Sequence, residues 1–240
     1  EKKTALPDLP EKLYARIEVP LDPEQARAYQ QMKQYAVAEF PGSIDRALAP
    51  IALTKMLRLS QITSGHLTVS DGFGTNTIKR FVNNPKIDVI VDLLEEHTHM
   101  VVFCMFIDEI KQLDERLTKE GISHGLIYGE TPNKTRETIQ EDYQNGRLRV
   151  VVCQVVTGGI GITLTQGHAA VFLTNPYSYE GRVQAEDRLH RPGQKHNVIY
   201  YDIVATCQGE KTIDHTVLQV LKKKEKLSDA ILGRQIGDML

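Results

Sequence analysis

The sequence has few cysteines, no long run of hydrophobic residues and no excess of charge of one sign. Its 240 residues include three cysteines (Cys104, Cys153 and Cys207), which are widely spaced and form no C-x-x-C pair. This argues against both a disulfide scaffold and a zinc site, and it suits a reducing compartment. The longest hydrophobic runs last only a few residues, so no membrane-spanning segment is expected.

The charge balance excludes a domain that holds nucleic acid by bulk positive charge alone. Twenty-nine Lys and Arg residues stand against 31 Asp and Glu residues, which gives a formal net charge of −2. Hydrophobic residues make up 41% of the chain and charged residues 25%, as in ordinary globular proteins. The length is sufficient for one large domain or two small ones with a well-packed core.

Several catalytic patterns are also absent. The sequence contains no G-x-S-x-G, H-E-x-x-H or EF-hand pattern, which removes support for hydrolase and metal sites of those kinds. It contains no G-x-x-x-x-G-K-[ST] pattern either, because Gly209-Glu-Lys211-Thr212 is only the tail of one. The lysine and the acidic residue that hold ATP and Mg²⁺ in P-loop enzymes are therefore missing, and no metal ligand is assigned.

Residues 1–82 are predicted to be mostly helical and to form a linker and a helical excursion. Two helices and a hairpin are expected, at residues 22–40, 48–62 and 67–81. Asp22-Pro23-Glu24 is a good helix start, with Asp as cap and Pro in the first turn. Asp71-Gly72-Phe73-Gly74, between flanks rich in Thr and Val, favours the hairpin.

Residues 83–206 are predicted to be an α/β domain in which short hydrophobic strands alternate with helices. The expected strands are 100–103, 123–127, 149–153, 169–174 and 198–205, and the expected helices are 85–96, 107–120, 131–143 and 179–191. This alternation indicates a parallel sheet covered by helices on both faces.

Residues 207–240 are predicted to add one helix, from about Thr212 to Leu232, that packs on this domain. Its hydrophobic stripe comprises Ile213, Val217, Val220, Leu221, Leu227 and Ile231. The same helix carries a basic run at Lys222, Lys223, Lys224 and Lys226. We interpret this run as a solvated face, with weak contact to DNA as the alternative.

The most specific motif is a polar string at the end of the α/β part. It reads Gln184-Ala-Glu-Asp-Arg188-Leu-His-Arg191-Pro-Gly193-Gln194. On a continuous helix Gln184, Arg188 and Arg191 would share one face. Two adjacent guanidinium groups repel each other unless an anion lies between them, and their planar fork matches phosphate oxygens. An exposed face with an Asp187–Arg191 ion pair near the helix end is the simpler alternative.

Two other segments could bind phosphate. Thr157-Gly158-Gly159-Ile160-Gly161 follows a predicted strand, and glycines let backbone N–H groups approach phosphate closely. It is no dinucleotide fingerprint, because Leu164 stands where a third Gly is required, and a tight turn explains it equally well. Thr131 is interpreted as the cap of the next helix, whose N-terminus, with Lys134 nearby, could hold a DNA phosphate.

In order and spacing these motifs resemble those of the C-terminal helicase lobe of Swi/Snf-type ATPases, within helicase superfamily two. The polar string resembles the last conserved motif of that family, and residues 154–165 resemble its Gly-Gly-Leu-Gly-Leu-Asn-Leu-Thr motif. Residues 9–29, 57–62, 99–106 and 129–143 are similar to further family segments, so the resemblance covers nearly the whole chain. The sequence differs from the family at Tyr128, where Asp is usual, and at residues 175–178, which replace an Asp-Pro-Trp segment.

The resemblance implies roles for individual residues. Arg188 and Arg191 would be arginine fingers that stabilise the transferred phosphoryl group of ATP. Gln184, Gly159 and Gly161 would contact the nucleotide. Thr157 and Gly158 would contact DNA phosphates, as would the segment around Thr131.

The resemblance further implies a RecA-like fold and a partner lobe. In that family the P-loop lysine and the magnesium-binding acid lie on an N-terminal lobe, and ATP binds with Mg²⁺ between the lobes. The chain, which begins at Glu1 without Met, is therefore expected to be the second half of an ATP-dependent translocase on double-stranded DNA. Alone it is expected to bind no ATP tightly. A cytoplasmic or nuclear location is expected, with no membrane partner.

Two alternatives remain open on the sequence. One is a non-catalytic RecA-like module that binds DNA or protein, and an intact first lobe elsewhere in the protein would argue against it. The other is a lobe of an RNA helicase, which the polar string and the Gly-Gly-x-Gly segment fit less well.

Overall fold

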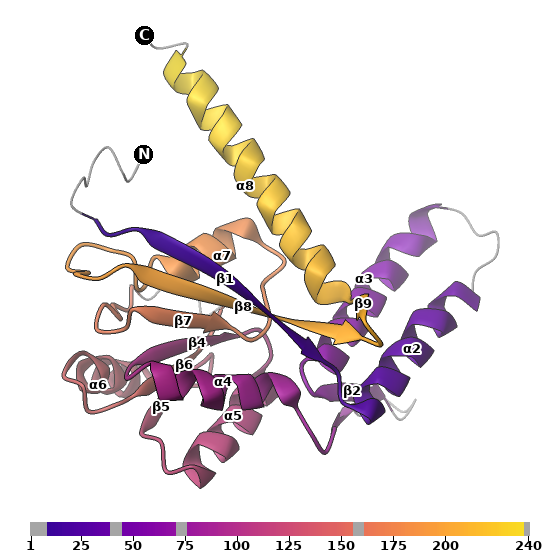
Figure 1. The fold of residues 1–240 in the computed structure, drawn as a ribbon. Coiled ribbons are helices and arrows are strands. Elements are labelled where there is room, and N and C mark those ends of the chain that lie inside the picture. Colours follow the sequence, from indigo (N-terminus) through magenta and orange to yellow (C-terminus); the bar gives the residue numbers. More distant parts are fainter. Residues whose placement is uncertain (1–8, 39–44, 71–75, 156–160, 238–240) are drawn as a thin grey trace.

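A computed structural model of the chain describes residues 9–38, 45–70, 76–155 and 161–237. Its centre is a seven-stranded sheet whose main path runs β1-β8-β7-β4-β6-β5, with every pair along it parallel (Figure 1). These strands are β1 (Lys12–Pro20), β4 (Met100–Cys104), β5 (His124–Ile127), β6 (Val150–Gln154), β7 (Ala169–Phe172) and β8 (Val198–Cys207). The short β9 (Glu210–Lys211) pairs antiparallel with β8.

Helices cover both faces of the sheet. They are α4 (Pro85–Glu96), α5 (Ile107–Lys119), α6 (Asn133–Gln144) and α7 (Tyr179–Glu186). Side chains of α4 and α5 pack with Met100 and Val102, whereas side chains of α6 and α7 pack with Val101 and Phe103. All five residues of β4 are buried, as expected for a central parallel strand. The predicted RecA-like α/β architecture is confirmed.

The edge strand β1 corrects the sequence prediction. Residues up to 82 were expected to be mostly helical, but Lys12–Pro20 forms nine residues of strand, in register from Lys12 beside Val198 to Pro20 beside Thr206. Ile17 and Val19 pack into the core beneath α4. The strand forms because β8 offers it a partner far along the chain, which no local pattern reveals.

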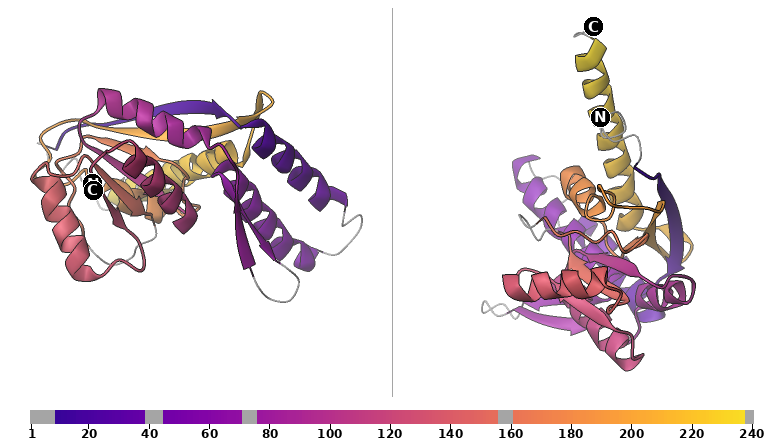
Figure 2. Two further views of the ribbon diagram at one scale, coloured as in Figure 1. Left: turned by 90° about the horizontal axis from the view of Figure 1, so that it is seen from below. Right: turned by 90° about the vertical axis from the view of Figure 1, so that its left-hand side faces the viewer.

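The expected helical excursion is present. The helices α2 (Pro23–Ala38) and α3 (Asp45–Thr63) lie side by side and project from the sheet-bearing body (Figure 2). The predicted hairpin follows as β2 (His66–Ser70) and β3 (Asn76–Arg80). A third hydrophobic core, which includes Tyr29, Ile62 and Val204, joins this excursion to the sheet.

The terminal helix α8 (Ile213–Gly237) begins close to the predicted position, and its far part extends away from the body (Figure 1). Ile213, Val217 and Leu221 are buried as expected, but Val220 is 43% exposed and does not belong to the stripe. The side chains of Leu227 and Ile231 lie outside the described part. Among the described residues, no helix combines the length and apolarity needed to cross a bilayer.

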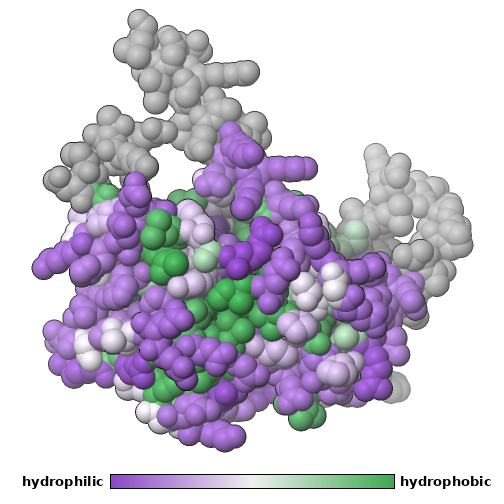
Figure 3. Space-filling view, in the orientation of Figure 1, coloured by the Kyte–Doolittle hydropathy of each residue, from purple (hydrophilic) through white to green (hydrophobic). Residues whose placement is uncertain are grey.

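Hydrophilic side chains dominate the face of the molecule seen in Figure 3, and hydrophobic ones gather in a band across its centre. Beneath this face lies the core that β1 and α4 share, where Ile17 and Val89 are only partly buried. Leu13 and Tyr14 of β1 are also exposed, by 44% and 54%. The edge of the sheet therefore retains accessible hydrophobic surface.

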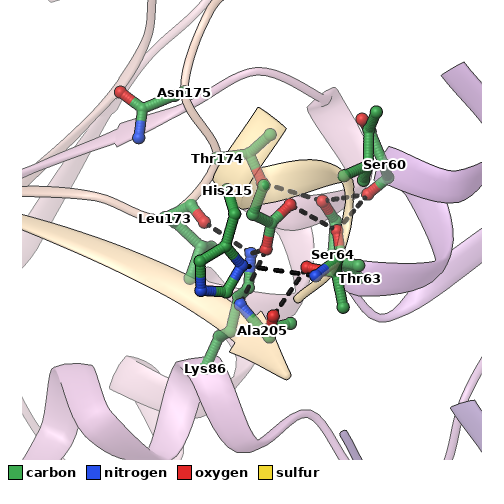
Figure 4. Close-up of polar contacts among 12 residues, drawn as sticks. Ser60, Thr63, Ser64, Lys86, Leu173, Thr174, Asn175, Ala205 and His215 are labelled. Atoms are coloured by element: carbon green, nitrogen blue, oxygen red, sulfur yellow. Dashed lines mark hydrogen bonds and ion pairs between the residues drawn. The ribbon is translucent and has the colours of Figure 1, made fainter. Parts of the chain in front are cut away.

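A buried ion pair joins the excursion, the sheet and α8 (Figure 4). The Lys86 ammonium, 2% exposed, lies 2.7 Å from Asp214 Oδ2 and donates to the Leu173 carbonyl. Asp214 also accepts from the Thr63 hydroxyl at 2.9 Å and from the Ala205 backbone N–H at 2.8 Å. One carboxylate thus binds groups from α3, α4 and β8 at the start of α8.

A second buried carboxylate lies in the same region. Glu109 Oε2 accepts from the backbone N–H groups of Met105 and Phe106, both at 2.9 Å. Its Oε1 accepts from the Thr174 hydroxyl, which lies 2.8 Å from the Ser64 hydroxyl at the end of α3 (Figure 4). Glu109 therefore links the start of α5 to the end of α3 through Thr174.

Replacing Lys86 with Ala should lower the free energy of unfolding by about 3–5 kcal/mol, because the Asp214 carboxylate would stay buried without its cation. Urea denaturation followed by circular dichroism measures this. Lys33→Ala is the control, since the Lys33–Glu210 pair is exposed by 51% and 67% and should contribute under about 1 kcal/mol. Equal effects of the two variants would contradict a special role for the buried pair.

Candidate nucleotide and nucleic-acid site

The two segments predicted to bind nucleotide lie against each other on the face of the sheet covered by α6 and α7. The Leu164 backbone N–H donates to the Arg188 carbonyl at 2.9 Å. The Arg191 guanidinium donates to the carbonyls of Gly161 and Ile162, both at 3.4 Å. Arg188, Arg191 and Gly161, to which the sequence assigns nucleotide contacts, therefore lie on two segments that contact each other. We call residues 161–167 the return segment and residues 188–194 the arginine segment.

The helical basis of the prediction was wrong. The α7 helix ends at Glu186, so Arg188 and Arg191 lie in the turns that follow it, and Gln184 does not share a helix face with them. Gln184 is exposed, Arg188 is 8% exposed and Arg191 is half-buried. After Glu186 the chain tightens into turns, because the N–H groups of Arg188 and Leu189 donate to carbonyls three residues back. Pro192 has no N–H to donate to the Arg188 carbonyl, which accepts from Leu164 instead.

The Arg188 side chain reaches the sheet and meets Cys153 at the end of β6. Burial raises the pKa of the Cys153 thiol to about 11, and the Arg188 guanidinium, which hydrogen-bonds to it, opposes that shift. Cys153 is fully buried and contributes to the core. Arg188 is therefore held from beneath by the sheet.

Gln194 fixes the far end of the arginine segment. Its side-chain amide donates to the carbonyls of Thr165 and Gly167, at 3.1 and 2.9 Å, and its Oε1 accepts from the backbone N–H of His196 at 3.0 Å. Gly193 has a φ of 100°, a left-handed conformation that favours glycine. The Gly-Gln ending of the string thus has a structural role.

Two glutamines of α6 hold the return segment from the other side, and the sequence analysis missed them. Gln140 Oε1 accepts from the Thr163 N–H at 2.9 Å, and Gln144 contacts both Gln166 and Thr165. Their i,i+4 spacing places them on one helix face, which is the pattern that could have revealed them. A side chain at Gly167 would collide with the hydroxyl of Tyr143.

A third missed residue, Arg182, anchors α7 itself. Its guanidinium binds Asn175, Asp202 and Glu186 and stacks on the Phe172 ring, with 3.5 Å between the guanidinium carbon and the ring centroid. Burial opposes ionisation of Glu186, but the charges of Arg182 and Lys12 lower its pKa. Lys12 also lies 3.7 Å from Asp187.

The predicted DNA-contacting turn lies at the carboxyl end of β5. The prediction that Thr131 caps the helix was wrong, because Pro132 occupies the cap position. Thr131 is 9% exposed, and its hydroxyl points inward and donates to the Leu126 carbonyl. Arg136 is buried and donates to the carbonyls of Thr131 and Tyr128, both at 2.7 Å. This arginine therefore shapes the turn rather than facing an outside phosphate.

Lys134 is exposed at the start of α6, and the Gly129 N–H of the adjacent turn donates to Gln154 of β6 at 3.3 Å. Thr157, Gly158 and Gly159, for which contacts with DNA or nucleotide were predicted, lie outside the described residues. Within the described part of the chain, no three His, Cys, Asp or Glu side chains are grouped so that they could hold a metal ion.

With this geometry established, the fold is that of a RecA-like α/β domain. Residues 85–193 match the family model of the helicase conserved C-terminal domain. The chain is similar to a Mycoplasma pneumoniae protein described as an uncharacterized ATP-dependent helicase, with 28% identity over 237 residues. That alignment covers 98% of this chain and 22% of the relative, so the chain spans about a fifth of the relative's length.

Solved structures of Swi2/Snf2 ATPases share the fold. One is the Sulfolobus solfataricus SWI2/SNF2 ATPase core in complex with dsDNA, with a TM-score of 0.69, 24% identity, and coverage of 91% of this chain and 45% of that one. Another is the C-terminal part of the Fun30 ATPase domain, with a TM-score of 0.67 and 15% identity. That match covers 89% of this chain and 90% of the other. The fold that the resemblance implies is thereby confirmed.

Replacing Gln194 with Ala should lower the free energy of unfolding by about 1–3 kcal/mol, because the buried carbonyls of the return segment would lose their donor. Gln184→Ala removes the exposed glutamine of the same string and should change the free energy of unfolding by under about 0.5 kcal/mol. Thermal and urea denaturation compare the two variants. If Gln194→Ala proved as mild as Gln184→Ala, the amide contacts would not hold the two segments together.

Proposed function

We propose that the chain is the second lobe of an ATP-dependent translocase on double-stranded DNA, and that it supplies arginine fingers to ATP bound by a first lobe. The observation that carries this proposal is the contact between the arginine segment and the return segment in a helicase C-terminal domain. The sequence contains no P-loop pattern, which supports a division of labour between two lobes.

Arg191 is suited to meet a phosphate. It is half-buried, and its contacts with Gly161 and Ile162 are long for charge-assisted hydrogen bonds. A guanidinium carries five N–H donors, so an anion can be bound while the side chain stays anchored. Arg188 lies three residues away on the same segment, which is held in place by Leu164.

The nucleotide itself would be shared between two lobes. ATP with Mg²⁺ would supply the phosphoryl group, and the lysine and acid that hold them would come from the partner lobe. This chain would contribute Arg188, Arg191, Gln184 and the glycines Gly159 and Gly161. Charge that develops on the transferred phosphoryl group would then be stabilised when the lobes close.

The DNA contacts proposed for this lobe are phosphate contacts without base readout. Thr131, Lys134, Thr157 and Gly158 offer at most one charged side chain among them, and the turn at Thr131 is already shaped by Arg136. The fold that this chain shares with a Swi2/Snf2 core solved with dsDNA supports a duplex as the substrate. Such contacts position the lobe on the backbone and carry no sequence information.

In the complete two-lobed protein, Arg188→Ala and Arg191→Ala should each lower ATP turnover by about 10³–10⁵, the range of arginine fingers in other phosphoryl-transfer enzymes. DNA affinity should change little, because neither residue is assigned to the DNA. Steady-state ATPase rates at saturating duplex DNA, with binding measured on the same protein, test this.

Arg147→Ala is the matched control, because Arg147 is 57% exposed and paired with Asp142 on the surface. Thermal denaturation of each variant separates a catalytic loss from unfolding, which matters for the buried Arg188. Arg191→Lys should restore little activity, since an ammonium lacks the planar fork. Turnover within a few-fold of normal in both alanine variants would end the assignment.

Binding of duplex DNA by the isolated chain should be weak and insensitive to sequence. With a net charge of −2 and few cationic contacts, it should release few counterions and show a shallow salt dependence. Titration of labelled duplexes of different sequence at several salt concentrations measures both properties. Tight binding to one sequence would contradict the proposed backbone contacts, and preference for RNA would favour an RNA helicase lobe.

A further inference from the structure

A groove of about 800 Å³ opens between β1, α7 and α8. Its lining includes no residue of the return segment or the arginine segment, so it is separate from the proposed nucleotide site. Its hydrophobic surface comes from Tyr14, Tyr179, Val183, Leu218 and Leu221. It lies where α8 leaves the body of the molecule beside the edge of the sheet (Figure 1).

The charges deep in the groove are paired within the protein. Glu186 accepts from the Lys12 ammonium at 2.8 Å and pairs with Arg182, which also pairs with Asp202. Asp187 lies 3.7 Å from the same ammonium. Three carboxylates thus share two cations here, so Lys12 and Arg182 are already engaged and only the rim cations remain for a ligand.

The rim carries the remaining charge, and it is mainly positive. Arg16, Lys222 and Lys226 line the groove and are exposed, and they face one rim carboxylate, Glu225. Lys222 and Lys226 are one helical turn apart, so both lie on the groove side of α8. Lys223 and Lys224 belong to the same basic run but do not line the groove. The groove thus presents cations around a hydrophobic floor.

The backbone of β1 adds a second feature. The Glu11 carbonyl accepts from Val198 and the Leu21 N–H donates to Thr206, so alternate residues from 11 to 21 direct their backbone groups toward β8. The residues between them, which include Tyr14 and Arg16, therefore direct their backbone N–H and C=O groups to the outer edge of the sheet. Within the described ranges β1 pairs with β8 alone, which leaves this edge open to another strand.

We propose that the groove binds an extended acidic segment of a partner protein. The segment adds to the outer edge of β1 by backbone hydrogen bonds. Its carboxylates meet the three rim cations, and a hydrophobic side chain between them covers the exposed Tyr14 and the partly exposed Val183. Charge complementarity selects an acidic partner over a basic one, and the open strand edge selects a polypeptide over a nucleic acid. The proposal does not depend on the ATPase assignment.

The test is a titration of the isolated chain with a fluorescein-labelled peptide that has Phe and Val at its centre and Asp and Glu on both sides, followed by fluorescence anisotropy. The double variant K222E/K226E should weaken binding by about tenfold or more. The matched control K223E/K224E makes the same change of net charge on the same helix and should stay within about twofold. Arg16→Glu, on β1, should weaken binding as well.

Three results would overturn the proposal. The first is the absence of saturable peptide binding. The second is an equal loss of peptide affinity in K222E/K226E and K223E/K224E. The third is displacement of the peptide by short duplex DNA, if the affinity for that DNA also falls in K222E/K226E. The second would indicate general charge attraction and the third a DNA-binding face. Circular dichroism of each variant confirms that it is folded; all four lysines are exposed, so the substitutions should leave the core intact.

Discussion

The pair formed by Lys86 and Asp214 is the contact on which the arrangement of the chain depends. It lies where α3 ends and where α4 and α8 begin, and Asp214 also binds Thr63 and Ala205. Moving any of these elements away would uncover a charge in an apolar interior, which costs several kcal/mol. The excursion and α8 are therefore bound to the sheet as one unit.

The need to pair buried charges also separates the structural arginines from those proposed to act on phosphate. Arg182 is saturated by carboxylates and an aromatic ring, and Arg136 is saturated by backbone carbonyls at 2.7 Å. Arg191 differs, because it is half-buried and its two contacts are 3.4 Å long. In a chain of nearly balanced charge, the availability of a guanidinium depends on its neighbours rather than on its residue type.

Local patterns predicted most of the fold, because the strands of the α/β part are short hydrophobic runs and the helices are periodic. They failed where a distant partner decides the conformation. Residues 12–20 become β1 because β8 pairs with them. Arg188 and Arg191 lie in turns after α7, where the Arg188 carbonyl accepts from Leu164 of a separate segment. The site was predicted as a set of motifs, but Gln140, Gln144 and Arg182 were missed, since their roles arise only when separate segments meet.

The helix α7 joins the two surfaces for which roles are proposed. Glu186, its last residue, accepts from Lys12 and Tyr14 of β1, and Arg188 follows two residues later in the arginine segment. Arg182 clamps the same helix to Asp202 of β8 and to Asn175, and breaking these contacts would leave buried charges unpaired. The arginine segment therefore follows a helix end that contacts from both β1 and β8 hold in place.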